Sequence, residues 1–211
     1  MLPTLLGNGG PVIWLILIAA ATAAIVFIER ALYCHRSQIN SAEFLNGVRT
    51  VIKRGNVVEA IAICDATAGP VARLVKAAIL NRELGRERVR EAVEETGLVE
   101  VPQLEERLNL LATIAQIAPL LGLFGTMVGF IQVFGGLQEA GLYAHIGGND
   151  PNSLASGIWK ALVCAASGIA VAIPAHAGYN YLVSRVNKIV LDMERAAAEI
   201  VNIVSENGNG K

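Results

Sequence analysis

Residues 108–137 read LNLLATIAQIAPLLGLFGTMVGFIQVFGGL, and none of these side chains is charged. About 20 helical residues cross the ~30 Å hydrocarbon core of a bilayer, because an α-helix rises about 1.5 Å per residue. The stretch exceeds that length, so it predicts a membrane-spanning helix that tilts or projects beyond the lipid. A buried helix of a soluble protein is the alternative, and the rest of the chain argues against it.

Two further apolar runs accompany this one. Residues 154–183 contain a single charge, Lys160, and residues 11–34 begin with 18 apolar or small residues before Glu29. Residues 1–10 contain no Lys or Arg, which a cleavable signal peptide would need, so we expect the first helix to be retained. Charged residues make up 17% of the chain and its mean hydropathy is +0.50, whereas soluble domains are about a quarter charged. The sequence therefore predicts an all-α membrane protein with three transmembrane helices and long cytoplasmic helical extensions.

The positive charges indicate an orientation in the bilayer. Lys and Arg are concentrated in segment 35–107 and at its edges, recur in the tail 184–211, and are absent from 138–153. Positive residues are retained on the cytoplasmic side of inner membranes. We therefore expect segments 35–107 and 184–211 to be cytoplasmic, and the N-terminus (1–10) and loop 138–153 to be periplasmic.

The segment 35–107 itself predicts several short helices. Ser41 and Asn56 are expected to cap the first two, and Gly69-Pro70 marks a break. Further helices are expected at about 71–84 and 87–95. A last helix is expected after Val101-Pro102, entering the membrane without interruption.

Small residues recur along the second and third membrane runs at spacings of three, four or seven. Such stripes let helix backbones approach closely in lipid. The residues that we expect to carry helix packing are Gly122, Gly125, Gly129, Gly168 and Pro174.

Few polar side chains interrupt these runs. Thr126 lies mid-span within the glycine stripe, so it either faces another helix or bonds to its own backbone. Lys160, Cys164 and Ser167 follow one face of the third run, although Lys160 is close enough to the helix end to snorkel to the interface. For His176 we expect a satisfied structural role.

The sequence does not favour a disulfide scaffold, an enzyme or a nucleic-acid-binding protein. The three cysteines are far apart and form neither a CxxC motif nor a disulfide framework. No HExxH, GxSxG, P-loop or paired-carboxylate pattern predicts an enzyme, a metal site or a cofactor. A net charge of -1 gives no reason to expect a nucleic-acid partner.

Two long motifs resemble a known family. IAPLLGLFGTMVGFIQVF (117–134) resembles the APLLGLLGTVxGM signature of the MotA/TolQ/ExbB proton-channel subunits, and GIWKALVCAASGIAVAIPAHAGYNYLVSRV (157–186) resembles their GIxxALxxTxxGLxxAIPAxxxYN motif. Three predicted spans match the ExbB/TolQ branch, since MotA-like members have four. The resemblance implies a homopentamer around a single-span ExbD- or TolR-like partner whose membrane Asp carries the proton, driving a TonB- or TolA-like protein.

The resemblance also implies site residues. Thr126 matches the family threonine in GLxGT, so an ion-pathway role carries over to it. Cys164 and Ala165 stand where many members have Thr, Lys160 stands where ExbB and TolQ have Glu, and Ser167 is a candidate substitute hydroxyl. Two alternatives of the same architecture stay open, a non-conducting scaffold and a sodium-using subunit.

Overall fold

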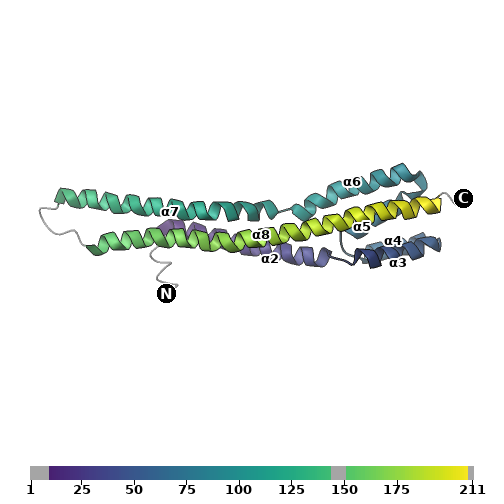
Figure 1. The fold of residues 1–211 in the computed structure, drawn as a ribbon, viewed down its shortest axis with the longest axis horizontal. Helices are drawn as coiled ribbons and strands as arrows, with labels where there is room; N and C mark the ends of the chain where they lie inside the picture. The colour runs from purple at the N-terminus through teal and green to yellow at the C-terminus, as the bar shows by residue number, and fades with distance from the viewer. Residues whose placement is uncertain (1–9, 144–150, 209–211) are drawn as a thin grey trace. The chain divides into compact units, whose positions relative to one another are not determined.

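The computed structural model describes residues 10–143 and 151–208, and within these ranges every regular element is helical. Three helical stretches, one within each of Pro11–Lys53, Arg86–Gly136 and Ala155–Val204, are long and apolar enough to cross a membrane. The predicted all-α class with three transmembrane helices is therefore confirmed. The elements in chain order are α2 (Gly10–Ser37), α3 (Ser41–Lys53), α4 (Val57–Ala66), α5 (Pro70–Leu80), the short 3-10 helix η1 (Arg82–Leu84), α6 (Arg86–Glu105), α7 (Leu108–Tyr143) and α8 (Pro151–Gly208), as Figure 1 shows.

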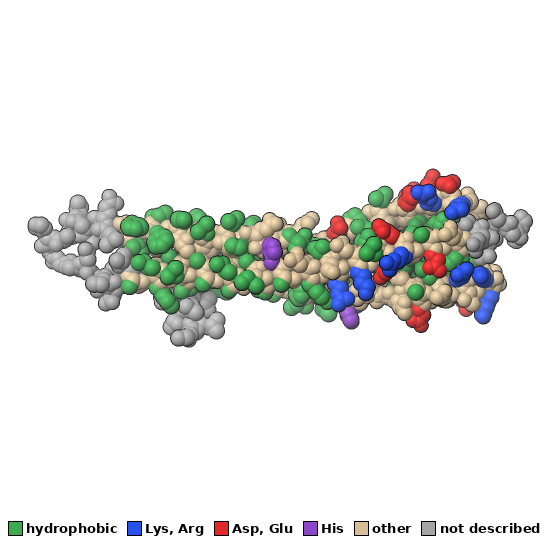
Figure 2. Space-filling model, in the orientation of Figure 1, with side chains coloured by type: hydrophobic (Ala, Val, Ile, Leu, Met, Phe, Trp, Pro, Cys, Tyr) green, Lys and Arg blue, Asp and Glu red, His purple; other side chains and the backbone are tan. Residues whose placement is uncertain are grey.

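The chain divides into two compact units. The membrane unit comprises residues 1–28 and 107–180, and the extramembrane unit comprises residues 29–106 and 181–211. Figure 2 shows hydrophobic side chains over the first unit, and Lys, Arg, Asp and Glu gathered over the second. This segregation is expected when only one of the two units is surrounded by lipid.

In the membrane unit, α7 and α8 are antiparallel neighbours and α2 packs on them. Gly122 lies against Gly168 and Gly129 lies against Ala161, so residue numbers rise along one helix as they fall along the other. In Figure 1, α2 passes behind α7 and α8 at its N-terminal end and then emerges below α8. The bundle is thus held by close helix contacts, the main source of packing energy where lipid removes the hydrophobic driving force.

The extramembrane unit has a conventional hydrophobic core. The α8 residues that contribute to it recur at alternating spacings of four and three, the pattern of a helix that buries one continuous stripe. Each fully buried Val, Leu or Ile stabilises the unit by about 2 kcal/mol. The buried residues include Val48 from α3, Ala60 from α4, Val71, Val75 and Ile79 from α5, Val89 and Val93 from α6, and Leu182, Val186, Ile189, Met193, Ala196, Ile200 and Ile203 from α8.

Two of the local predictions for this unit need correction. Asn40 rather than Ser41 caps α3, because its side-chain oxygen accepts a hydrogen bond of 3.5 Å from the backbone N–H of Glu43. Asn and Ser are equally good N-caps, so their order in the sequence could not distinguish them. Asn56 does cap α4, as predicted, accepting from the backbone N–H of Glu59 at 3.4 Å.

The second correction concerns Pro102. It lies inside α6, and the helix ends instead at Glu105, with Glu106 as its C-cap, followed by Arg107 with a φ of 63°. Proline removes the hydrogen bond to the carbonyl four residues earlier, that of Leu98. The Leu98 side chain is 77% exposed, so water can reach this side of the helix and α6 continues through the proline.

A buried arginine fixes the end of α6. Arg30, from α2, is 5% exposed and lies 3.2 Å from a carboxylate oxygen of Glu106. It also donates a hydrogen bond to the backbone carbonyl of Gln103 at 3.2 Å. These contacts use the carbonyl and carboxylate groups that the end of a helix leaves available.

The long helices extend past the predicted membrane limits. α7 continues to Tyr143 and α8 begins at Pro151, so both helices reach into the predicted loop 138–153. α8 also passes residue 183 without a break. Residues 1–9 of the predicted periplasmic N-terminus and residues 144–150 of the predicted loop lie outside the described residues. The lipid boundaries and the orientation stay predictions.

Candidate ion-pathway site

The backbones of α7 and α8 nearly touch where two glycines of the predicted stripes meet. A Cβ added to Gly168 would lie 2.6 Å from the carbonyl oxygen of Ala118 and 2.8 Å from the Cα of Gly122. A Cβ on Gly122 would lie 3.0 Å from the carbonyl oxygen of Cys164. Only glycine fits at such a backbone-to-backbone approach.

The same contact extends along α7 toward Gly125 and Gly129. A Cβ on Gly125 would meet the Cβ of Cys164 at 2.7 Å and a methyl group of Val12 at 3.1 Å. A Cβ on Gly129 would meet the Cβ of Ala161 at 2.9 Å. Gly125 therefore marks the point where α2, α7 and α8 come together, with Cys164 buried in the contact.

Thr126 follows Gly125 and lies at the same level of the contact. It is 9% exposed, and its hydroxyl donates a hydrogen bond of 2.6 Å to the backbone carbonyl of Leu123. This bond to its own helix is one of the two arrangements left open by the sequence. A hydroxyl oxygen that donates one hydrogen bond still has lone pairs with which to accept another.

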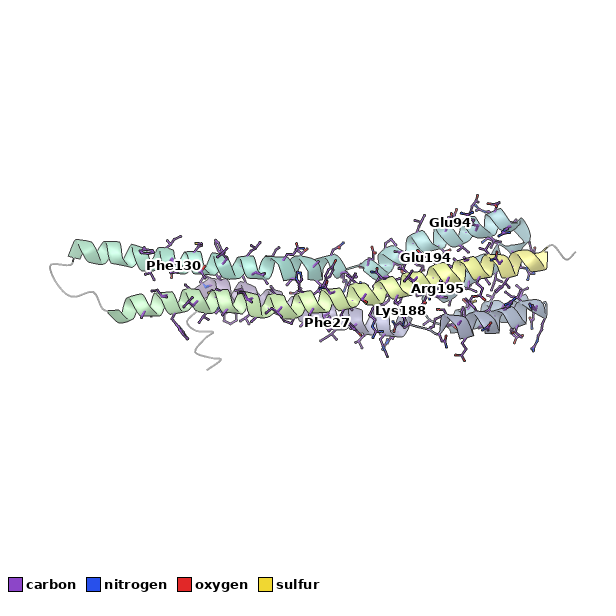
Figure 3. The ribbon with its side chains drawn as sticks, viewed as in Figure 1. Phe27, Glu94, Phe130, Lys188, Glu194 and Arg195 are labelled. Carbon is purple, nitrogen blue, oxygen red and sulfur yellow. The ribbon has the colours of Figure 1, made fainter. Side chains whose placement is uncertain are left out.

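The α8 residues of the predicted pathway occupy different surroundings. The Ser167 hydroxyl, half-buried, donates to the backbone carbonyl of Val163, and Lys160 is exposed. A helix turns about 100° per residue, so 18 residues make about five full turns and 11 residues make about three. Gly178 follows Lys160 by 18 residues and Ser167 by 11, so all three point in nearly the same direction. Gly178 packs against Phe27 of α2, labelled in Figure 3, so this is the side of α8 that carries α2.

The site therefore consists of two parts. Cys164 and Thr126 lie at one level of the α7–α8 contact, whereas Lys160 and Ser167 lie on the α2 side of α8. Pro174 is exposed inside α8, and the helix is continuous through it.

The membrane runs lack an acidic group. Residues 108–137 and 154–183 contain no Asp or Glu, and Lys160 and His176 are their only charged or imidazole side chains. Within the described residues, no group of three or more His, Cys, Asp or Glu side chains could hold a metal ion. A proton relay that uses a carboxylate therefore needs a second polypeptide to supply it.

Comparison with known proteins now identifies the family. The sequence profile of the MotA/TolQ/ExbB proton channel family matches residues 66–195, which include the α7–α8 contact. The chain belongs to this family. Family membership and the three apolar helices make it a multi-pass protein of the inner membrane, on the ExbB/TolQ-like branch.

Individual MotA/TolQ/ExbB relatives point to the same branch. An ExbB homolog of the biopolymer transport class from Methanothermobacter thermautotrophicus is 29% identical over 85% of this chain and 62% of its own length. The Tol-Pal system protein TolQ of Haemophilus influenzae is 36% identical over 53% of this chain and 46% of its own. An ExbB-like biopolymer transport protein of Synechocystis is 32% identical over 84% of this chain and 68% of its own. The chain thus spans about half to two thirds of the length of these relatives.

The sequence did not predict two buried charged residues. Glu100 is 6% exposed and lies 2.6 Å from a guanidinium nitrogen of Arg73, and Arg30 is buried as described above. A signal existed for Glu100, since it shares one helix face with the apolar residues Val93 and Leu104. Their contacts connect α5 to α6 and α2 to α6, so they support the helical scaffold outside the membrane unit.

Proposed function

We propose that this chain is the channel-forming motor subunit of an inner-membrane complex of the ExbB/TolQ kind. It uses the proton motive force together with a single-span ExbD/TolR-like partner that carries a membrane Asp. The work drives an envelope process of the TonB-dependent or Tol-Pal type through a TonB- or TolA-like protein. Family membership, the tight α7–α8 contact around Thr126 and the lack of acidic residues in the membrane runs support this proposal.

Thr126 provides the chemistry for such a partner. A protonated carboxyl group can donate a hydrogen bond to the Thr126 oxygen while the hydroxyl remains bonded to Leu123. After the proton leaves, the hydroxyl can turn and donate to the carboxylate instead, which stabilises its negative charge. A threonine can therefore stabilise both protonation states of the partner, which a valine of the same shape cannot.

The proposed assembly is a homopentamer with the N-terminus and residues 138–153 in the periplasm. Many large apolar side chains of α7 and α8 are exposed in the single chain, among them Leu120, Phe124 and Ile131 on α7. Such a surface is stable only against lipid, other copies or the partner helices. Segments 35–107 and 184–211 are then cytoplasmic, in agreement with their Lys and Arg content.

The observation that carries the proposal is the buried Thr126 hydroxyl beside the tight α7–α8 contact at Gly125, and Thr126→Val tests it. We expect proton flux through proteoliposomes containing the chain and its partner to fall about ten-fold or more, as when a charge-stabilising donor is lost. Thr113→Val is the matched control, because Thr113 also bonds to its own backbone, at 2.7 Å to Asn109, but is exposed. Full flux in Thr126→Val with normal assembly would remove Thr126 from the pathway.

One observation favours a second candidate, a non-conducting scaffold. Cys164 stands at a position where many family members have Thr, and here it is 3% exposed and packed against Gly125. Flux of the unmodified complex equal to that of empty liposomes would favour the scaffold. Dependence of activity on sodium at fixed pH would instead indicate a sodium-using subunit.

A further inference from the structure

Large polar side chains are exposed near one end of the membrane unit, within the uncharged or nearly uncharged membrane runs. Besides Asn109 at the start of α7, they are Gln116 on α7 and His176 and Asn180 on α8. In the proposed topology this end faces the cytoplasm.

On α8, both polar residues point away from α2. Gly178 contacts Phe27 of α2, where its added Cβ would lie 2.9 Å from the ring. His176 precedes Gly178 by two residues and Asn180 follows it by two, and two residues correspond to about 200° of helix rotation. Both side chains therefore project from the opposite side of α8.

On α7, the geometry gives the same result. Gly125 faces both Cys164 of α8 and Val12 of α2. Gln116 lies nine residues earlier, which is about 900° of rotation, so its side chain points in the opposite direction. The contact of Ala118 and Gly122 with Gly168 sets the register of the two helices. From that contact, Gln116 is about 9 Å along α7 and His176 about 12 Å along α8 toward the same end. Gln116 and His176 thus share one face and nearly one level, and Asn180 lies on the same face about 6 Å nearer the end.

This face cannot lie against hydrocarbon. An amide side chain has two donors and an acceptor with two lone pairs, and an imidazole needs a partner at each nitrogen. Thr113 satisfies its hydroxyl on its own helix, but one helix backbone cannot satisfy a whole amide. Leaving such groups unpaired in lipid costs several kcal/mol each.

The other half of the same face is apolar. Leu123 and Phe130 on α7, and Leu162 and Ile169 on α8, all lie within about 40° of the direction opposite the α2 contacts and are 39–57% exposed. Figure 2 views this half of the face, because the N-terminal part of α2 lies behind α7 and α8 there, and Phe130 is labelled in Figure 3. This face therefore has two ends of different polarity. The end with Gln116, His176 and Asn180 is polar, the opposite end is apolar, and the change occurs near the level of Thr126.

We propose that Gln116, His176 and Asn180 line a water-filled outlet through which the proton leaves toward the cytoplasm. The inference rests on the proposed function, since it starts from a proton released near Thr126. His176 accepts that proton on one ring nitrogen and releases its other ring proton to water, and a return of the tautomer restores the starting state. Gln116 and Asn180 hold the water by hydrogen bonds. The apolar half of the face keeps the outlet closed to the periplasmic side.

Thiol labelling tests the outlet in the complete complex in membrane vesicles. The background is a chain in which Cys34 and Cys64 are replaced by Ala, and Cys164, which is buried in the helix contact, is kept and its own labelling subtracted. We expect Gln116→Cys and His176→Cys to react with a charged, membrane-impermeant maleimide added from the cytoplasmic side. The matched controls Ile117→Cys and Ala177→Cys are adjacent, exposed and turned away from the face, so they should react about ten-fold more slowly or not at all, because a thiolate does not form in lipid. Equal rates at test and control positions would overturn the outlet.

Proton flux completes the test. His176→Leu should lower flux about ten-fold relative to the unmodified complex, whereas Ala177→Leu should leave it unchanged. Suppose that the unmodified complex conducts and that Thr126→Val lowers its flux. Full flux in His176→Leu would then overturn the outlet and leave the proposed function intact. Absence of flux in the unmodified complex would instead overturn the proposed function.

Discussion

Replacing Gly168 with alanine tests whether the α7–α8 backbone contact stabilises the protein. The added Cβ would lie 2.6 Å from the Ala118 carbonyl oxygen, whereas ordinary contacts begin at 3.4 Å, so the backbones must separate by about 0.8 Å. The obstructing atoms belong to the α7 backbone, so no side chain can rotate to relieve the overlap. Overpacking of this kind costs about 1–3 kcal/mol, equivalent to a change of about five- to 150-fold in the unfolding equilibrium.

The measurement is the equilibrium unfolding of the purified complex in detergent as SDS is added, followed by circular dichroism. The control is Gly136→Ala on α7, which adds the same methyl group where no atom lies within 4 Å. We expect Gly168→Ala to shift the midpoint to lower SDS, and Gly136→Ala to leave it unchanged or raise it, since alanine is the better helix former.

A double substitution sharpens the interpretation. Once Gly168→Ala has separated the backbones, Gly122→Ala meets less overlap. The double variant should therefore be destabilised by less than the sum of the two single destabilisations. Identical midpoints for Gly168→Ala and Gly136→Ala would refute the close contact. Strictly additive effects of Gly122→Ala and Gly168→Ala would show that the two glycines act at separate places.

Two further predictions concern the extramembrane unit. Arg73→Ala leaves the buried carboxylate of Glu100 unpaired and should destabilise the protein by about 2 kcal/mol. Arg90→Ala breaks an exposed pair and should change the stability little; thermal unfolding of both variants measures this. Burial, with a smaller effect of the adjacent Asp65, raises the pKa of the Cys64 thiol to about 11. The test compares two chains that each carry one thiol, either Cys64 or Val58→Cys, which is 79% exposed on the same helix. Cys64 should react with iodoacetamide at pH 8 far more slowly than Val58→Cys. The unfolded chain loses this proton at lower pH than the folded chain, so the stability it contributes is complete below the unfolded pKa and is lost as pH rises through about 11. Equal losses for the two arginine variants, or equal alkylation rates for the two thiols, would contradict these expectations.

The architecture was predictable because lipid imposes strong constraints. Runs such as 108–137 have one physical explanation, and helices are the only open-ended structures that satisfy their own backbone in a bilayer. The cap at Asn56 and the break at Gly69-Pro70 were also predicted. The end of α6 was not, because it depends on the tertiary contact of Arg30 with Glu106, which no local pattern encodes.

The candidate site was less predictable than the fold. The glycine stripes indicated close packing, yet only the register shows that Gly122 meets Gly168 and that Gly125 meets both Val12 and Cys164. Periodicity placed Cys164 and Ser167 on one face, but it could not tell that one packs into the α7 contact while the other points to the α2 side. Such distinctions depend on which neighbour occupies each side of a helix, and that is a property of the assembled bundle.

The approach of Gly122 to Gly168 has a consequence for leakage. Two backbones in direct contact leave no room for a file of water molecules between them, so each chain forms an insulating wall at this level. Under the proposed function, ions would then cross where one chain meets another copy or a different polypeptide. Such a complex would conduct only once assembled, and an isolated chain would not dissipate the gradient.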